Sequence, residues 1–132
     1  MIIPMKGIEI IFLAAGGLAG VFLRYGVTKS PLLIGALPVN VLIVNVVGSF
    51  ILGSFAMLSQ QWNLDEKYTL LIAVGFCGGL TTMSSFALES VNLMDAKQYS
   101  LVIIAVIANV GLSLGAIFGG RALTSVILGG LR

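Results

Sequence analysis

Four long stretches without a charged side chain determine what this chain can fold into. They run over residues 10–23, 34–64, 68–88 and 98–120. Three of them meet or exceed the roughly 20 residues that an α-helix needs to cross a bilayer. Only 9% of the 132 residues are charged, and the mean hydropathy of +1.12 is far from that of an ordinary soluble domain. We therefore predict an all-α integral membrane protein, with spans at about 8–27, 38–59, 68–94 and 99–120 forming one domain over 1–132.

The first stretch is the shortest, and it also suits the apolar region of a signal peptide preceded by Lys6. No small-x-small cleavage site follows Leu23, however. Glu9 and Arg24 lie close enough to the ends for their side chains to reach the membrane interface. We therefore favour a span. Pro38 suits the start of the second span, because the first turn of a helix needs no amide donor.

The Lys and Arg residues divide almost evenly between the two sides of the membrane. The four on the side of the N-terminus are Lys6, Lys67, Arg121 and Arg132, and the three on the other side are Arg24, Lys29 and Lys97. The positive-inside rule therefore hardly favours one orientation of the chain in the membrane over the other. A chain that inserts either way can form an antiparallel dimer, although a near-balance in so small a count also arises by chance.

Small residues recur at a spacing of four in three of the spans. They are Gly16 and Gly20, then Ser49 and Gly53, then Gly111, Gly115 and Gly119. Such faces let helix backbones approach closely in a membrane. The pattern fits packing within one subunit and packing between subunits equally well.

The segment GGLTTMSSF at 78–86 predicts an interruption near the centre of the third span, between Gly78 and Thr82. Two glycines weaken a helix, and the hydroxyl side chains offer competing local hydrogen bonds. Backbone groups freed at membrane depth must be satisfied by protein, water or an ion. The carbonyl end of one half-helix suits a cation and the amide end of the other suits an anion. The alternative is a packing notch whose hydroxyls bond back to their own helix.

The other spans carry a few polar residues at membrane depth. Asn45 lies near the middle of the second span, and Asn109 and Ser113 share one face of the fourth. A side-chain amide in hydrocarbon needs partners, so these residues bind either a neighbouring helix or a passing hydrated ion.

The ionisable side chains of the spans lie only near the ends, at Glu9, Arg24 and Glu89. A passive path for a small ion therefore fits better than proton exchange.

Phe86 either packs in the protein core or presents the positive edge of its ring to an anion. The chain has no histidine and no nucleophile beside a recognisable base, so we expect no enzyme activity. The single cysteine, Cys77, is interpreted as a small core residue, and no basic tract suggests nucleic acid.

Three segments carry a resemblance to a known family. GGLAGVFLRYGV at 16–27, VNVVGSFILG at 44–53 and GFCGGLTTMSSFALES at 75–90 resemble, in order, the motifs of the CrcB/Fluc fluoride channels. The resemblance implies an antiparallel, dual-topology homodimer of four-helix subunits in a prokaryotic plasma or inner membrane. It also implies two fluoride pores that export toxic cytoplasmic fluoride, and one structural sodium ion at the dimer centre.

Carried over by position, the resemblance implies that the backbone carbonyls of Gly78 and Thr81 are sodium ligands. It places the remaining site residues in two groups. The fluoride pore comprises Asn45, Met83, Ser84, Ser85, Phe86, Asn109 and Ser113, and the vestibule or its support comprises Arg24, Thr82 and Glu89. Asn45 would donate its amide hydrogens to fluoride. Met83 departs from the family, which has a pore-lining phenylalanine there, and a methionine has no ring edge.

Two other classes of protein share some of these features. A proton-coupled transporter of the small multidrug-resistance type also has four short spans, but it needs a carboxylate well inside the first one. A membrane assembly protein that transports nothing would use the glycines and polar residues for helix association alone. Uptake of an aromatic cation would favour the former, whereas fluoride efflux favours the channel.

Overall fold

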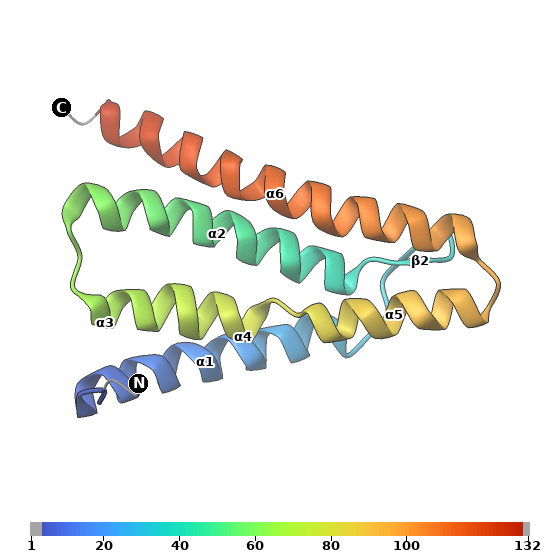
Figure 1. Ribbon diagram of the computed structural model, residues 1–132, viewed down its shortest axis with the longest axis horizontal. Coiled ribbons are helices and arrows are strands. Elements are labelled where there is room, and N and C mark those ends of the chain that lie inside the picture. Colours follow the sequence, from blue (N-terminus) through green and yellow to red (C-terminus); the bar gives the residue numbers. More distant parts are fainter. Residues whose placement is uncertain (1–3, 131–132) are drawn as a thin grey trace.

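The computed structural model describes residues 4–130, and four helical segments of this part are long and apolar enough to span a membrane. These are α1 (Gly7–Thr28), α2 (Asn40–Trp62), the composite third span (Glu66–Asp95) and α6 (Tyr99–Gly129). In Figure 1, α2 lies along α6, and α1 lies along the first half of the third span. The predicted all-helical, multi-pass membrane architecture is confirmed.

The third span is built from several segments. It comprises α3 (Glu66–Thr69), the π-helical segment η1 (Leu70–Cys77), α4 (Gly78–Leu80) and α5 (Met83–Asp95). Between α4 and α5, Thr81 and Thr82 are extended, with ψ angles of 154° and 119°. The helix axis bends by only 14° across the third span. The structure thus contains an interruption, although it changes the direction of the chain little.

The interruption is narrower than the range predicted from the sequence. Gly78 and Gly79 remain helical, and only Thr81 and Thr82 leave the helix. Gly79 has a packing role instead, because a Cβ there would press on the backbone of Gly17 and Val21 in α1. A glycine at this point therefore permits close helix contact rather than ending the helix.

A small hairpin connects α1 and α2. Its strands are β1 (Leu33–Ile34) and β2 (Leu37–Pro38), and Gly35 occupies the turn with φ +62°. Pro38 therefore lies in a strand opposite Leu33, and the second helix begins at Asn40 rather than at Pro38. The pairing of the two strands keeps Pro38 extended, which a proline at a strand end permits.

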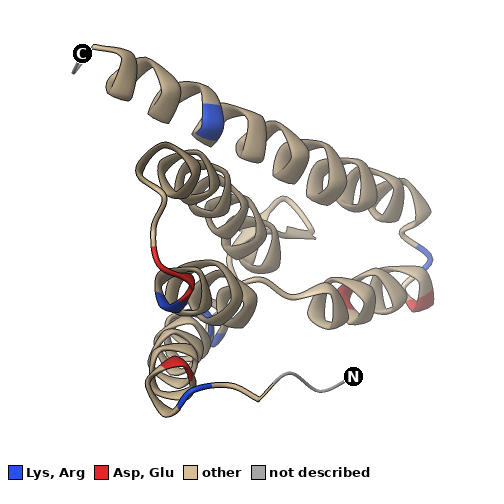
Figure 2. Ribbon diagram, turned by 60° about the vertical axis from the view of Figure 1, so that its left-hand side comes forward, with Lys and Arg blue, Asp and Glu red and all other residues tan. Residues whose placement is uncertain are grey.

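The fourth span runs past the expected end at residue 120 and continues to Gly129. Arg121 is the only charge in this extension, and the residues that follow it are apolar or hydroxylic, so nothing ends the helix there. Figure 2 shows most of the charged residues at the ends of the helices or in the segments that join them, whereas Arg121 lies within α6 and Glu89 within α5. Arg132, counted above for orientation, lies outside the described residues, and dual topology stays a prediction.

The three sets of small residues differ in whether they pack against another helix of the same subunit. A Cβ on Gly16 or Gly20 would collide with the backbone of η1, and a Cβ on Gly53 would collide with the backbone of Ile117 in α6. By contrast, a Cβ on the fourth-span glycines would meet nothing within 4 Å in the described chain. These last glycines are Gly111, Gly115 and Gly119. The first two sets therefore pack within the subunit, whereas the third set faces outward.

Gly53→Ala is expected to lower the free energy of unfolding by about 1–3 kcal/mol, the usual effect of an extra methyl group in a tight contact. The methyl group would push α2 away from the Ile117 backbone. Thermal unfolding in detergent micelles measures the loss. Gly115→Ala is the matched control, since its methyl group meets open space in the described chain. Equal melting temperatures for the two variants would contradict this account of the packing.

Candidate functional site

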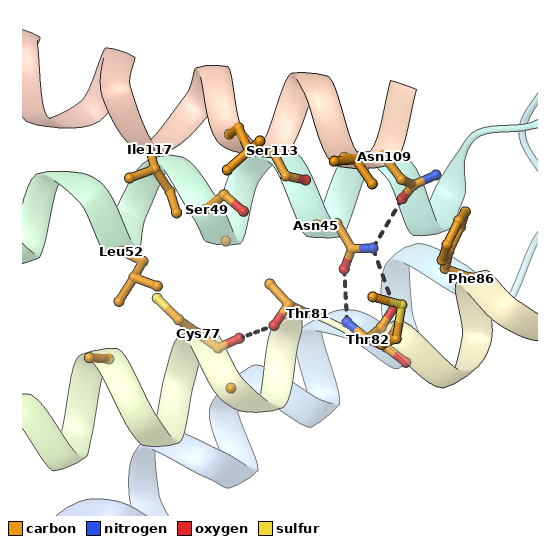
Figure 3. A pocket seen from close by; sticks show the side chains of 16 residues that line it. Asn45, Ser49, Leu52, Cys77, Thr81, Thr82, Phe86, Asn109, Ser113 and Ile117 are labelled. Atoms are coloured by element: carbon orange, nitrogen blue, oxygen red, sulfur yellow. Dashed lines mark hydrogen bonds between the residues drawn. The ribbon is translucent and has the colours of Figure 1, made fainter. Parts of the chain in front are cut away.

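A cavity of about 450 Å³ lies between α2, α6 and the interrupted third span. Most of its lining is apolar, and Figure 3 shows the polar side chains gathered around the interruption. Eight of the site residues predicted from the sequence line this cavity: Asn45, Gly78, Thr81, Thr82, Met83, Phe86, Asn109 and Ser113. The three-dimensional fold therefore brings together residues from the second, third and fourth spans. Ser84, Ser85, Arg24 and Glu89 do not line it.

Asn45 is the centre of the polar cluster. Its Oδ1 accepts a hydrogen bond from the Thr82 backbone N–H at 2.8 Å, and its Nδ2 donates to the Thr82 carbonyl at 3.3 Å and to Asn109 Oδ1 at 3.1 Å. Asn109 Nδ2 in turn donates to the Ala105 carbonyl at 3.0 Å. Both amide hydrogens of Asn45 are thus used within the chain, whereas Asn109 keeps one for another acceptor.

The hydroxyl groups after the interruption form a separate cluster at the start of α5. Thr82 Oγ1 accepts a hydrogen bond from the Ser85 backbone N–H at 3.2 Å, which caps the helix. The same hydroxyl lies 3.1 Å from Ser85 Oγ and 3.2 Å from Ser84 Oγ. Ser84 and Ser85 therefore bond locally in this structure, and their role in a pore stays a prediction.

The carbonyls of Gly78 and Thr81 accept no hydrogen bond within residues 4–130. The Cys77 carbonyl, by comparison, accepts from both the backbone N–H of Thr81 at 3.0 Å and its Oγ1 at 2.8 Å. Gly78 is exposed and Thr81 is half-buried, and both line the cavity. Free carbonyl oxygens at a helix break are suitable ligands for a small hard cation.

Arg24 binds the interruption from α1. Its Nε–H donates to the Gly79 carbonyl at 2.8 Å in a partly buried position. A charged donor thus satisfies a carbonyl at the end of the first half-helix, where the dipole favours positive charge. This contact gives Arg24 a structural role at the interruption, and its assignment to the vestibule of a pore stays a prediction.

Three side chains on α5 differ in exposure. Met83 is 72% exposed, whereas Phe86 is half-buried and lies at the same end of the cavity as Asn109 (Figure 3). Glu89 is half-buried and lies outside the cavity. Phe86 is therefore the aromatic ring that this subunit itself presents to the polar cluster.

Asn40 was not selected from the sequence, yet its side chain makes three hydrogen bonds at the entrance to α2. Oδ1 accepts from the Leu32 N–H, and Nδ2 donates to the carbonyls of Val27 and Ser30, all at 2.7 Å. Only 4% of Asn40 is exposed. The available signal was an asparagine just before an apolar run, where such residues favour helix starts and turns.

Comparison with known proteins shows which family and which individual proteins this chain is similar to. Residues 11–121 match the family described as CrcB-like protein, Camphor Resistance (CrcB). A protein of Nitrosopumilus maritimus called fluoride-specific ion channel FluC is 60% identical over 124 residues, which cover 94% of this chain and 98% of that protein. A protein of the same name from Rhizobium etli is 38% identical, with 92% of this chain and 99% of that protein covered. Another, from Methanococcus maripaludis, is 37% identical over 86% of this chain and 93% of its own.

Proposed function

The chain is a member of the CrcB family, and from this premise we propose that it is a passive, fluoride-selective channel that exports fluoride from the cytoplasm. The observation that carries the proposal is the cavity around Asn45 and Asn109. It holds polar donors and a phenylalanine at membrane depth. Among its lining residues in the described chain there is no carboxylate, lysine or arginine. Such a lining suits a small anion that moves without proton exchange.

Fluoride would replace its water ligands with donors from this lining. The second amide hydrogen of Asn109 and the hydroxyl of Ser113 are available in the subunit, and the edge of the Phe86 ring carries partial positive charge. Larger halides would meet steric resistance where the apolar residues narrow the path. Selectivity would therefore follow from the small number of donors and the size of the passage.

We infer further that two copies assemble as an antiparallel homodimer. Met83 and Gly78 line the cavity but are exposed on the single subunit, so a second copy can complete the wall. The near-equal division of Lys and Arg residues permits both orientations in the membrane.

The free carbonyls of Gly78 and Thr81 would hold a structural sodium ion in this assembly. One subunit supplies two carbonyl oxygens, and the partner would supply the same two across a twofold axis. The bound ion would neutralise the carbonyl dipoles and tie the two copies together. Uncharged carbonyl oxygens, such as those of Gly78 and Thr81, are suitable ligands for a sodium ion.

The main alternative, a proton-coupled transporter, depends on Glu9. In the structure Glu9 lies in the first turn of α1, where its Oε2 accepts a hydrogen bond from the Lys6 backbone N–H at 2.8 Å. A carboxylate that caps the start of a helix lies at the end of the span rather than at its centre. No contact of Glu9 therefore favours the transporter.

Purified protein in fluoride-loaded liposomes is expected to release fluoride rapidly once an ionophore lets potassium leave as the counter-ion. Chloride-loaded liposomes are the control, and they should release little chloride because the donors and the passage suit the smaller ion. A fluoride electrode and a chloride electrode measure the two fluxes. Fluoride that stays inside, at a protein density that gives each vesicle several copies, would overturn the channel assignment.

A further inference from the structure

Asn45 binds both backbone polar groups of Thr82, the second extended residue of the interruption. The Thr82 N–H donates to Asn45 Oδ1 at 2.8 Å, and Asn45 Nδ2 donates to the Thr82 carbonyl at 3.3 Å, although the two residues are 37 positions apart (Figure 3). The side-chain amide therefore pairs with the main chain as a neighbouring β-strand would.

This pairing removes the donor that the Gly78 carbonyl would have in a continuous helix. In an α-helix each N–H donates to the carbonyl four residues earlier, so the Thr82 N–H would bond to Gly78. Because this N–H donates to Asn45, the Gly78 carbonyl has no donor within residues 4–130. Gly78 is exposed and lines the cavity. The carbonyl is thus free for a ligand.

The Thr82 hydroxyl has the corresponding effect on the Thr81 carbonyl. In a continuous helix the Ser85 N–H would donate to Thr81, but it donates to Thr82 Oγ1 at 3.2 Å. Two side chains, one from α2 and one from the interruption itself, therefore occupy the two donors that would satisfy Gly78 and Thr81. Gly78 and Thr81 are the two residues whose carbonyls are proposed to bind sodium.

We propose that Asn45 is a positioning residue for the cation site, which it maintains through Oδ1 by keeping the Thr82 N–H away from the Gly78 carbonyl. This inference rests on the proposed function, in which two copies share the cation. Asn45 would then couple the cation site to the anion path, because the same side chain also orients Asn109 through its Nδ2. A role limited to donating to fluoride would not affect cation binding.

Asn45→Leu tests the proposal without any measurement of fluoride. Leucine keeps the branched shape of the side chain but cannot accept the Thr82 N–H. The melting temperature of purified protein is measured against sodium concentration, with N-methyl-D-glucamine keeping the ionic strength constant. The sodium concentration for half-maximal stabilisation is expected to rise by roughly 10–100-fold, the usual effect of losing a residue that orients metal ligands. Asn40→Asp is the control: it loses buried hydrogen bonds of the same helix, and it should lower the melting temperature without moving that concentration.

Two further variants keep the test decisive if Asn45→Leu does not fold. Asn45→Asp retains an oxygen that accepts the Thr82 N–H but cannot replace both amide donors, so it should need no more sodium than the wild type. Thr82→Val removes the acceptor for the Ser85 N–H, so it should need more sodium. The opposite order of these two variants would overturn the proposal.

Fluoride efflux by the wild type, measured separately, distinguishes this inference from the channel assignment. If the wild type releases fluoride and sodium stabilises it, but Asn45→Leu and Thr82→Val need the same sodium as the wild type, the positioning role is wrong and the channel stands. Absence of sodium stabilisation in the wild type would also overturn the positioning role, whatever the efflux. If sodium shifts as expected while fluoride stays trapped, the channel assignment fails and the positioning role of Asn45 stands.

Discussion

Phe86→Ile is expected to reduce fluoride efflux by about 100-fold or more, which corresponds to a rise of roughly 2.7 kcal/mol in the barrier. Isoleucine fills much of the volume of the ring, and such apolar exchanges usually cost a folded protein little. Isoleucine lacks the partly positive edge of an aromatic ring, however. A dehydrated anion beside Asn109 therefore loses its aromatic partner. Because Met83 supplies no ring at the neighbouring position, this loss is not compensated within the subunit.

The measurement is fluoride efflux from liposomes at matched protein density, together with the melting temperature in detergent. Phe50→Ile is the matched control, because Phe50 is a partly exposed ring on α2 that does not line the cavity. We expect this control to retain wild-type efflux. Equal efflux from both variants would show that the ring of Phe86 only fills space.

Asn40→Leu is expected to lower the free energy of unfolding by about 3 kcal/mol or more, since each buried backbone group that loses its partner costs about 1–3 kcal/mol. The change removes three hydrogen bonds, those to the Leu32 N–H and to the carbonyls of Val27 and Ser30. These bonds join the end of α1, the hairpin and the start of α2. The hairpin should therefore loosen along with the loss of global stability.

Chemical or thermal unfolding in micelles measures the stability, and protease cleavage within residues 30–38 reports the loosening of the hairpin. Asn92→Leu is the matched control, as Asn92 is an exposed asparagine on α5 for which a change of less than about 0.5 kcal/mol is expected. If Asn40→Leu unfolds and is cleaved as the wild type is, the hydrogen bonds of Asn40 do not stabilise the junction of α1, the hairpin and α2.

The sequence alone determined that the chain is a multi-pass membrane protein, and it singled out three polar residues that line the cavity. Long uncharged runs have few other stable outcomes, because the backbone must satisfy its own hydrogen bonds in a bilayer. The same logic identified Asn45, Asn109 and Ser113, since polar groups at that depth require partners. These inferences need only local composition and spacing, which the sequence contains in full.

Only the tertiary structure decided where the third span is interrupted and which carbonyls are left free. The paired glycines predicted a wider break, but Gly79 packs against α1 and remains helical. The extended residues are Thr81 and Thr82, because the acceptor that holds the Thr82 N–H comes from Asn45 in another helix. A hydrogen bond between residues so distant in the chain leaves no local signal in the segment that it reshapes, so its effect emerges only once the helices pack.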